Sequence, residues 1–261
     1  MAKKPVNWLE YDGGDQILPF HVVKEKYAGQ KDVISFSTGI PKLDGYLNGG
    51  IMLGELYTVT GPTKQGKTLL LQTITKNLEP QGANPLWFQF EVPQRQFLNQ
   101  FPQLPTGFMP SELVPNSLSW LAERVLESKA KFFSQIIFVD HLHYLFDMAR
   151  SRNPSLEIGT LVRGLKRIAV TMDVVIFLAC HTTKISKETK SKDLDYSILR
   201  DSGIISQESD SVFIITRVDS DASDNLAQMK IEFHRRTGVR KKVVPLVKIR
   251  GWLEELEEER S

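Results

Sequence analysis

The sequence predicts an α/β protein in which a mostly parallel central sheet carries helices on both faces. Short, almost continuously apolar stretches alternate along the chain with longer stretches whose apolar residues recur three and four apart. The first pattern is typical of strands buried on both faces, and the second of helices that pack against a sheet. A phosphate-binding glycine loop between one such strand and one such helix supports the same fold class.

The expected elements follow one another in chain order. The apolar stretches that we expect to form strands are residues 56–60, 86–90, 134–139, 174–180, 211–215, 229–233 and 243–249. Helices are expected from residue 69 onward, over 117–131 and over 158–172, where the apolar spacing is helical. A basic turn separates the last two strands, and the residues from 252 onward are expected to form an acidic helix or tail.

Composition excludes several classes of protein. The 261 residues suffice for one large α/β domain with short extensions. A net charge of +2 gives no overall attraction to nucleic acid, so any such attraction must be local. No apolar stretch is long enough to span a bilayer, and the N-terminus lacks the apolar core of a secretory signal. The single cysteine, Cys180, excludes an internal disulfide and fits a reducing, cytoplasmic compartment.

The most informative motif is a complete phosphate-binding loop, which consists of Gly61, Pro62, Thr63, Lys64, Gln65, Gly66, Lys67 and Thr68. It fits the pattern G-x-x-x-x-G-K-[ST], in which backbone N–H groups wrap the phosphates of a nucleotide. Lys67 would reach the β- and γ-phosphates, and Thr68 would hold Mg²⁺. The flanking strand and helix argue against a chance match, so we expect the chain to bind a nucleoside triphosphate.

Three polar residues stand directly after expected strands, where open α/β sheets bind their ligands. Asp140 follows residues 136–139 and is the candidate Mg²⁺ ligand, with a helix cap as the alternative. Glu91 follows 87–90, a strand that we expect beside the phosphate-loop strand, and is the candidate general base; a surface glutamate is the alternative. His181 is the candidate donor to the γ-phosphate, or a structural histidine. No spacing of His and Cys indicates a zinc site.

Several stretches together resemble a known family. Residues 199–210 read Leu-Arg-Asp-Ser-Gly-Ile-Ile-Ser-Gln-Glu-Ser-Asp and precede an expected strand, and residues 234–238 read His-Arg-Arg-Thr-Gly. The other stretches are residues 37–44, 49–50, 54–56 and 139–145, together with Glu91. They resemble the RecA-like ATPase core of DnaB-type replicative helicases, superfamily 4, whose members carry Leu-Arg-Glu-Ser-Gly followed by Glu-Gln-Asp-Ala-Asp where this chain has residues 199–210.

The resemblance implies a RecA-like P-loop NTPase core over residues 34–250. Residues 1–33 would be an N-terminal extension or docking segment in place of the family's N-terminal domain, and residues 251–261 an acidic C-terminal tail. It further implies a DNA helicase or translocase that hydrolyses ATP with Mg²⁺, assembles into a ring, hexameric in form, and acts on single-stranded DNA during DNA replication or recombination.

The resemblance also implies roles for single residues. Glu91 would be the catalytic glutamate, and Arg236 would be an arginine finger that reaches the nucleotide site of a neighbouring subunit, with Arg235 and Arg240 as rivals. The chain departs from the family's usual residues at four histidines. The family usually has Tyr and Gln at His141 and His143, Gln at His181 and Lys at His234.

Two basic segments are candidates for contact with DNA. The lysines after His181 and the arginines after the Asp140 strand would face the central channel of a RecA-like ring, where they would contact phosphates without reading sequence. These residues are Lys184, Lys187, Lys190, Lys192, Arg150 and Arg152. An ordinary solvated loop is the alternative for the lysines.

Two other functions are compatible with the sequence. The phosphate loop and the segment before it also occur in RadA- and KaiC-like ATPases, which do not unwind DNA. A nucleotide-dependent loader or regulator of a replication or recombination complex, with little turnover, is the third possibility.

Overall fold

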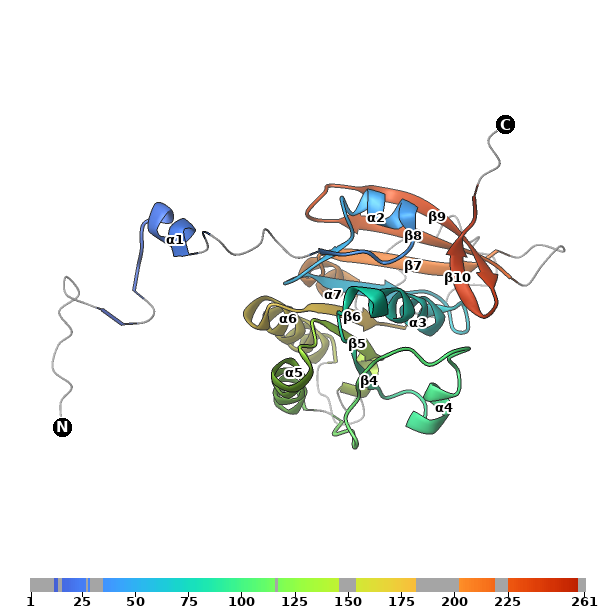
Figure 1. Ribbon diagram of the computed structural model, residues 1–261, viewed down its shortest axis with the longest axis horizontal. Coiled ribbons are helices and arrows are strands. Elements are labelled where there is room, and N and C mark those ends of the chain that lie inside the picture. Colours follow the sequence, from blue (N-terminus) through green and yellow to red (C-terminus); the bar gives the residue numbers. More distant parts are fainter. Residues whose placement is uncertain are drawn as a thin grey trace. The chain divides into compact units, whose positions relative to one another are not determined.

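The computed structural model describes residues 12–13, 16–26, 28, 35–115, 117–145, 154–181, 202–218 and 225–257. By its internal contacts the chain divides into two compact units, Met1–Ile34 and Ser35–Ser261. The first unit holds helix α1 (Phe20–Lys26), in which no residue is buried. The other elements belong to the second unit (Figure 1). No helix in the described part of the chain is long and apolar enough to cross a membrane.

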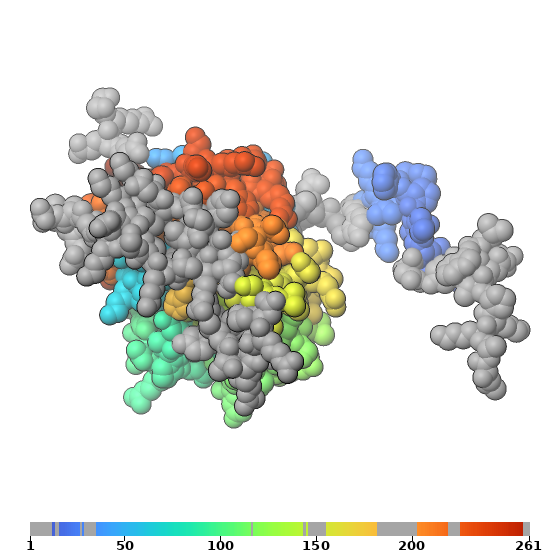
Figure 2. Space-filling model, turned by 180° about the vertical axis from the view of Figure 1, so that it is seen from behind, coloured from blue at the N-terminus to red at the C-terminus, as the bar shows by residue number. Residues whose placement is uncertain are grey.

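An eight-stranded sheet forms the centre of the second unit, in the order β10-β9-β8-β7-β3-β6-β5-β4 (Figure 1). The strands β7, β3, β6, β5 and β4 are parallel, and β8, β9 and β10 are added antiparallel. Their bounds are β3 (Leu56–Thr60), β4 (Leu86–Gln89), β5 (Ile136–Asp140), β6 (Val175–Ala179), β7 (Ser211–Arg217), β8 (Leu226–His234), β9 (Arg240–Ile249) and β10 (Trp252–Glu255). From behind, the red residues of β8 and β9 adjoin the orange residues of β7 (Figure 2). The predicted mostly parallel sheet is confirmed.

The position of β4 corrects one expectation. We expected this strand beside the phosphate-loop strand β3, but β4 lies at the edge of the sheet and pairs with β5. The neighbours of β3 are β6 and β7. The expectation followed the tendency of consecutive strands to be neighbours. The connection through helix α3 instead passes over the two positions in the sheet that β6 and β5 occupy between β3 and β4. Nothing in the residues of β4 itself indicates this arrangement.

Helices cover both faces of the sheet, as predicted. Side chains alternate along the strands, so that Tyr57 belongs to one core and Leu56 to the other. The first core includes Ile74 of α3 (Lys67–Leu78), and the second includes Val162 of α6 (Pro154–Met172). The remaining helical elements are α2 (Pro41–Tyr46), η2 (Glu79–Gln81), α4 (Gln94–Leu98), α5 (Leu118–Phe132), η3 (Leu142–Leu145) and α7 (Ser202–Glu208), and a small sheet pairs β1 (Ser35–Phe36) with β2 (Ile51–Met52).

The ends of α5 and α6 follow from local chemistry. The Oγ of Ser117 accepts a hydrogen bond from the backbone N–H of Trp120 at 3.2 Å, so Ser117 caps α5. Helix α6 begins at Pro154, four residues before the expected start at residue 158. Proline is well suited to the first turn of a helix, where its missing N–H has no intrahelical partner.

Residues 252–255 do not form part of the acidic helix or tail that is expected from residue 252 onward. These residues form β10, which pairs antiparallel with β9. Trp252 and Leu253 are buried, and the backbone N–H of Leu253 donates to the Oγ1 of Thr73 at 3.1 Å. The turn consists of Arg250 (φ 49°) and Gly251 (φ 89°), a two-residue hairpin loop with positive φ at both positions.

The described part of the 199–210 stretch joins helix α7 to the start of β3. The buried Ser209 and Thr58 hydroxyls are 2.7 Å apart, and the Oδ2 of Asp210 accepts from the backbone N–H of Leu56 at 2.8 Å. Lys166 of α6 reaches the same carboxylate at 2.5 Å. This stretch of the family resemblance therefore holds the strand that leads into the phosphate loop.

Candidate active site

The phosphate loop connects β3 to α3 and lines an open cleft of about 590 Å³. Gly66, the residue before α3, has φ 104°, and Gly61 has φ 151°. A Cβ atom on Gly61 would stand 2.2 Å from the backbone oxygen of Ile215, so only glycine fits this approach to β7. The residues lining the cleft are Thr63, Lys64, Gly66, Lys67, Thr68, Leu69, Gln72, Glu91, Gln100, His141, His181 and Arg217.

Lys67 turns its ammonium group into the loop. Its Nζ donates to the backbone oxygens of Gly61 at 2.9 Å and Pro62 at 3.1 Å. Burial lowers the pKa of Lys67, although the nearby carboxylates of Asp140 and Glu91 oppose that shift. A buried cation beside several backbone N–H groups and a helix N-terminus makes the loop a site for an anion.

Thr68 and Asp140, the two candidate metal ligands, are in direct contact. The Oδ2 of Asp140 accepts from the Oγ1 of Thr68 at 2.9 Å and from the Nε2 of Gln89 at 3.1 Å. Burial would raise the pKa of Asp140, but His141, Thr68 and Gln89 outweigh burial and hold that pKa below its usual range. Asp140 is therefore a charged carboxylate in a fully buried position.

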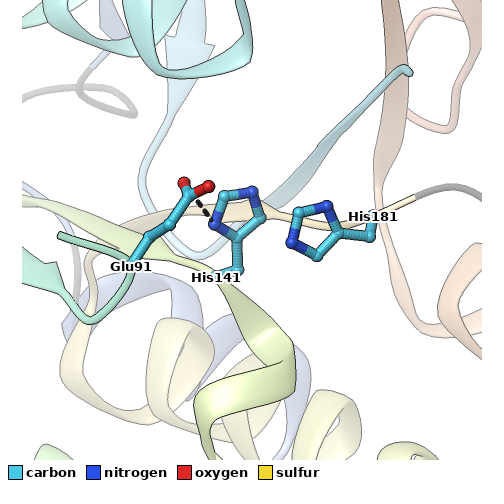
Figure 3. A group of neighbouring side chains, drawn as sticks. All are labelled: Glu91, His141 and His181. Carbon is cyan, nitrogen blue, oxygen red and sulfur yellow. Dashed lines mark ion pairs between the residues drawn. The ribbon is translucent and has the colours of Figure 1, made fainter. Parts of the chain in front are cut away.

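Glu91 lies beside a pair of histidines, His141 and His181, and all three residues line the cleft (Figure 3). One carboxylate oxygen of Glu91 lies 3.0 Å from the Nδ1 of His141, which is also 2.7 Å from the Oδ1 of Asp140. The rings of His141 and His181 stack with centroids 4.0 Å apart and planes 9° from parallel. The ends of β4, β5 and β6 thus bring Glu91, Asp140 and His181 to one place.

Arg236 lies in the turn between β8 and β9, away from the phosphate loop of its own chain. Its Nε donates to Glu55 at 2.8 Å and its Nη2 to the backbone oxygen of Gly50 at 2.9 Å. Glu55 stands immediately before β3, whereas the phosphate loop follows the other end of that strand. At about 3.3 Å per residue, the two ends of β3 are roughly 15 Å apart.

The rival arginines have other surroundings. The guanidinium of Arg235 lies 3.4 Å from Asp210 and donates to the backbone oxygen of Gln207 at 2.6 Å, and Arg240 is exposed at the start of β9. The six residues proposed for DNA contact lie outside the described residues; they are Lys184, Lys187, Lys190, Lys192, Arg150 and Arg152.

His141 and Arg217 are among the cleft residues to which the sequence assigns no role. His141 was noted only as a departure from the family, although it follows a candidate metal ligand directly. Arg217 ends strand β7, and its backbone N–H donates to Gln65 of the phosphate loop at 2.5 Å. The usable signal in both cases is the position at the carboxyl end of a parallel strand.

Comparisons with protein families give two matches that overlap over residues 109–112. Residues 36–112 match the KaiC family model, and residues 109–247 match the model of the DnaB-like helicase C terminal domain. Among curated proteins, the replicative DNA helicase DnaB of Rickettsia felis is 25% identical, with 71% of this chain and 46% of that protein covered. The DNA repair protein RadA of Helicobacter pylori (strain J99) is 28% identical, with 59% and 34% covered. The chain thus spans less than half the length of these relatives.

Solved structures share the fold. One solved ATPase domain superimposes with a TM-score of 0.77 at 18% identity, over 91% of this chain and 96% of that chain. A DnaB-like replicative helicase, solved in a study of its interactions with primase, gives a TM-score of 0.76 at 18% identity, over 91% and 65%. These matches confirm the RecA-like fold of the helicase ATPase domains. Because the family model covers more than half of its residues, this chain belongs to the DnaB-like helicase C-terminal domain family.

Proposed function

We propose that this protein is an ATP-hydrolysing motor that assembles into a ring and moves on single-stranded DNA. One observation carries the proposal: Lys67, Thr68, Glu91 and His181 line one cleft, and Asp140 contacts Thr68. A bound triphosphate would meet, in that cleft, groups that bind phosphate, hold a metal and activate water.

The residues of the cleft fit ATP and Mg²⁺. The Oδ1 of Asp140 is buried with the Nδ1 of His141 at 2.7 Å, and the Thr68 hydroxyl lies beside the other carboxylate oxygen. Oxygen donors of this kind are the ligands that Mg²⁺ prefers. A bound Mg²⁺ would neutralise negative charge on the phosphates. Lys67 would donate hydrogen bonds to the β- and γ-phosphates instead of to the backbone oxygens of Gly61 and Pro62.

Glu91 is the group proposed to orient and deprotonate the attacking water. Its carboxylate is partly exposed at the edge of the cleft, and its backbone N–H donates to Gln89 at 2.7 Å, which fixes the chain where β4 ends. His181 is proposed to donate to the γ-phosphate. Both residues lie two positions beyond the end of a strand that the sheet holds, so their positions do not depend on a long loop.

Arg236 is proposed to act on the nucleotide of a neighbouring subunit. It lies at the opposite end of β3 from its own phosphate loop, and Glu55 holds its guanidinium there. Subunits that associate head to tail would bring this end of one molecule to the cleft of the next. An arginine supplied in this way raises turnover by about 10³–10⁵-fold.

DNA contact is proposed for the lysines at 184, 187, 190 and 192 and the arginines at 150 and 152. The proposed compartment is the cytosol, whose reducing conditions are compatible with the single thiol of Cys180. Steady-state ATPase activity with and without a single-stranded oligonucleotide tests the motor. We expect stimulation by the oligonucleotide that weakens as salt rises. Normal nucleotide binding without any stimulation would contradict a motor.

The same assay tests the lysines directly. The double variant Lys187→Gln/Lys190→Gln should need more oligonucleotide for half-maximal stimulation and should flatten the dependence on salt. Lys131→Gln is the matched control, because Lys131 is an exposed lysine on α5, where it pairs with Glu127. Equal behaviour of the double variant and the control would remove these lysines from the DNA site.

Residues 1–33 are proposed to dock onto a neighbouring subunit, and residues 34–250 to form the ATPase domain. Ile17 is 99% exposed and Phe20 is 94% exposed, so this segment offers apolar side chains that its own unit does not bury. Removal of residues 1–33 should leave the folded domain intact and weaken self-association, as measured by native mass spectrometry with ATP.

A RadA- or KaiC-like ATPase that does not unwind DNA is the second candidate, and the KaiC family match over residues 36–112 favours it. Strand displacement from a forked duplex separates the two. DNA-stimulated ATPase without displacement would favour this candidate, whereas nucleotide binding with negligible turnover would favour a loader or regulator.

A further inference from the structure

Three metal-ligating side chains meet at the ends of neighbouring strands. Glu91 follows β4, His141 follows β5 and His181 follows β6, and these strands lie side by side in the sheet. One donor atom from each residue lies within 4.8 Å of the other two (Figure 3). Because the residues are far apart in the sequence, no spacing of His and Cys could indicate this cluster.

His141 is the member of this cluster whose surroundings most favour binding of a metal ion. Its side chain is only 2% exposed, and its Nε2 makes no hydrogen bond within the part of the chain that the structure describes. A buried polar group without a hydrogen bond destabilises the folded protein. The Nδ1 lies near the carboxylates of Asp140 and Glu91, and the Nε2 has no such neighbour among the described ion pairs.

Two imidazoles and one carboxylate suit a particular class of ion. This is a ligand set of catalytic zinc sites, in which water fills the remaining position. Mg²⁺ prefers oxygen donors, so it belongs with Thr68 and Asp140 instead. Asp140 also lies 2.7 Å from a ring nitrogen of His141, which matches the carboxylate that commonly orients a metal-bound histidine.

We propose that Glu91, His141 and His181 form a binding site for one transition-metal dication, Zn²⁺ above all, and that the bound ion inhibits ATP hydrolysis. Coordination requires the His181 ring to rotate out of its stack on His141, because the lone pairs of parallel rings do not converge. The inhibition rests on the proposed function: an ion on the carboxylate of Glu91 withholds it from the attacking water. The binding itself does not depend on that function.

The test is a titration of tag-free, nucleotide-free protein with Zn²⁺, followed by calorimetry, and with Co²⁺, followed by its visible absorption, both in excess Mg²⁺. We expect one ion per chain. His141→Gln and His181→Gln should each weaken binding by more than about tenfold. His21→Gln is the control, since His21 is exposed on α1, and it should leave binding unchanged. A titration of the unmodified protein without stoichiometric binding, or equal binding by all variants, would overturn the site.

ATPase assays separate the site from the proposed function. Zn²⁺ should inhibit turnover, and a zinc-selective chelator should restore it while Mg²⁺ remains in excess. Binding of one ion to a chain that never hydrolyses ATP would support the site and contradict the function. If the protein hydrolyses ATP and Zn²⁺ does not change the rate, inhibition by the bound ion is contradicted and the proposed function stands.

Discussion

At the scale of single residues, the cleft combines one buried cation with two carboxylates of different character. Lys67 and Asp140 are buried, whereas the carboxylate of Glu91 is 36% exposed. Asp140 keeps its charge because Thr68, Gln89 and His141 surround it. A carboxylate fixed by three neighbours suits metal binding, and one that reaches into the open cleft suits proton transfer from water.

The substitution Glu91→Gln tests the proposed base. It removes the proton acceptor and keeps the shape of the side chain, so nucleotide binding should persist while kcat falls by about 10²–10⁴-fold. Binding of a fluorescent ATP analogue and steady-state hydrolysis measure the two effects. Glu123→Gln, an exposed substitution on α5, should change neither, and full turnover by Glu91→Gln would place the base elsewhere.

At the scale of elements, the fold was predictable wherever a strand is buried on both faces. Strands β3 and β6 are wholly buried, and such continuous apolar runs leave little choice of structure. Strand β10 was not predicted because the glutamates that follow Trp252 and Leu253 mask the apolar pattern of a short strand. Arg250 and Gly251 were the available turn signal.

The hairpin β9–β10 should contribute measurably to stability. Leu253→Ala removes a side chain that is 4% exposed, and it should lower the free energy of unfolding by about 2–5 kcal/mol. Glu257→Gln, at an exposed position beyond the strand, is the control. Chemical denaturation measures both variants, and a negligible effect of Leu253→Ala would mean that β10 is not docked.

The contact between Glu55 and the turn that carries Arg236 should make stability depend on acidity. Burial would raise the pKa of Glu55, but His234, Arg236 and Tyr57 outweigh burial and lower it from 4.5 to about 2. A carboxyl whose pKa is lowered in the folded protein stabilises the fold at pH values above the pKa that it has in the unfolded chain. This contribution is lost as pH falls from 4.5 towards 2. At pH 7 it amounts to about 3 kcal/mol.

The matching experiment compares the wild type with Glu55→Gln by denaturation at pH 7 and at pH 3. The stability difference between the two proteins should shrink by about 2 kcal/mol at the lower pH. Glu123→Gln should show no such change. A difference that is the same at both pH values would mean that Glu55 is not held as an anion in the folded protein.

At the scale of the whole molecule, the cleft and Arg236 lie at opposite ends of strand β3. The carboxyl ends of β3, β4, β5 and β6 carry the cleft, and Arg236 is held by Glu55 just before the opposite end of β3. A single chain therefore has an arginine that its own cleft does not use. Head-to-tail assembly, as proposed for a ring, would complete each cleft with an arginine from the next subunit.

The sequence could indicate which residues belong to the cleft, but not how they meet. The phosphate loop is a contiguous motif, so its residues were all recognisable. Glu91, His141 and His181 become neighbours only through the order β6-β5-β4, which depends on the packing of the whole sheet. For the same reason the predicted position of β4 was wrong, and the sequence did not indicate the cluster of Glu91 with two histidines.

Mixing two inactive variants tests the shared active site most directly. Glu91→Gln lacks the base and Arg236→Gln lacks the arginine, so each alone should hydrolyse ATP poorly. In mixed rings, an Arg236→Gln subunit followed by a Glu91→Gln subunit forms a cleft with every native residue, and random 1:1 mixing should create such clefts at about a quarter of the interfaces. We predict that ATPase activity returns on mixing. Mixed assemblies, verified by mass spectrometry, that stay inactive would contradict an active site shared between subunits.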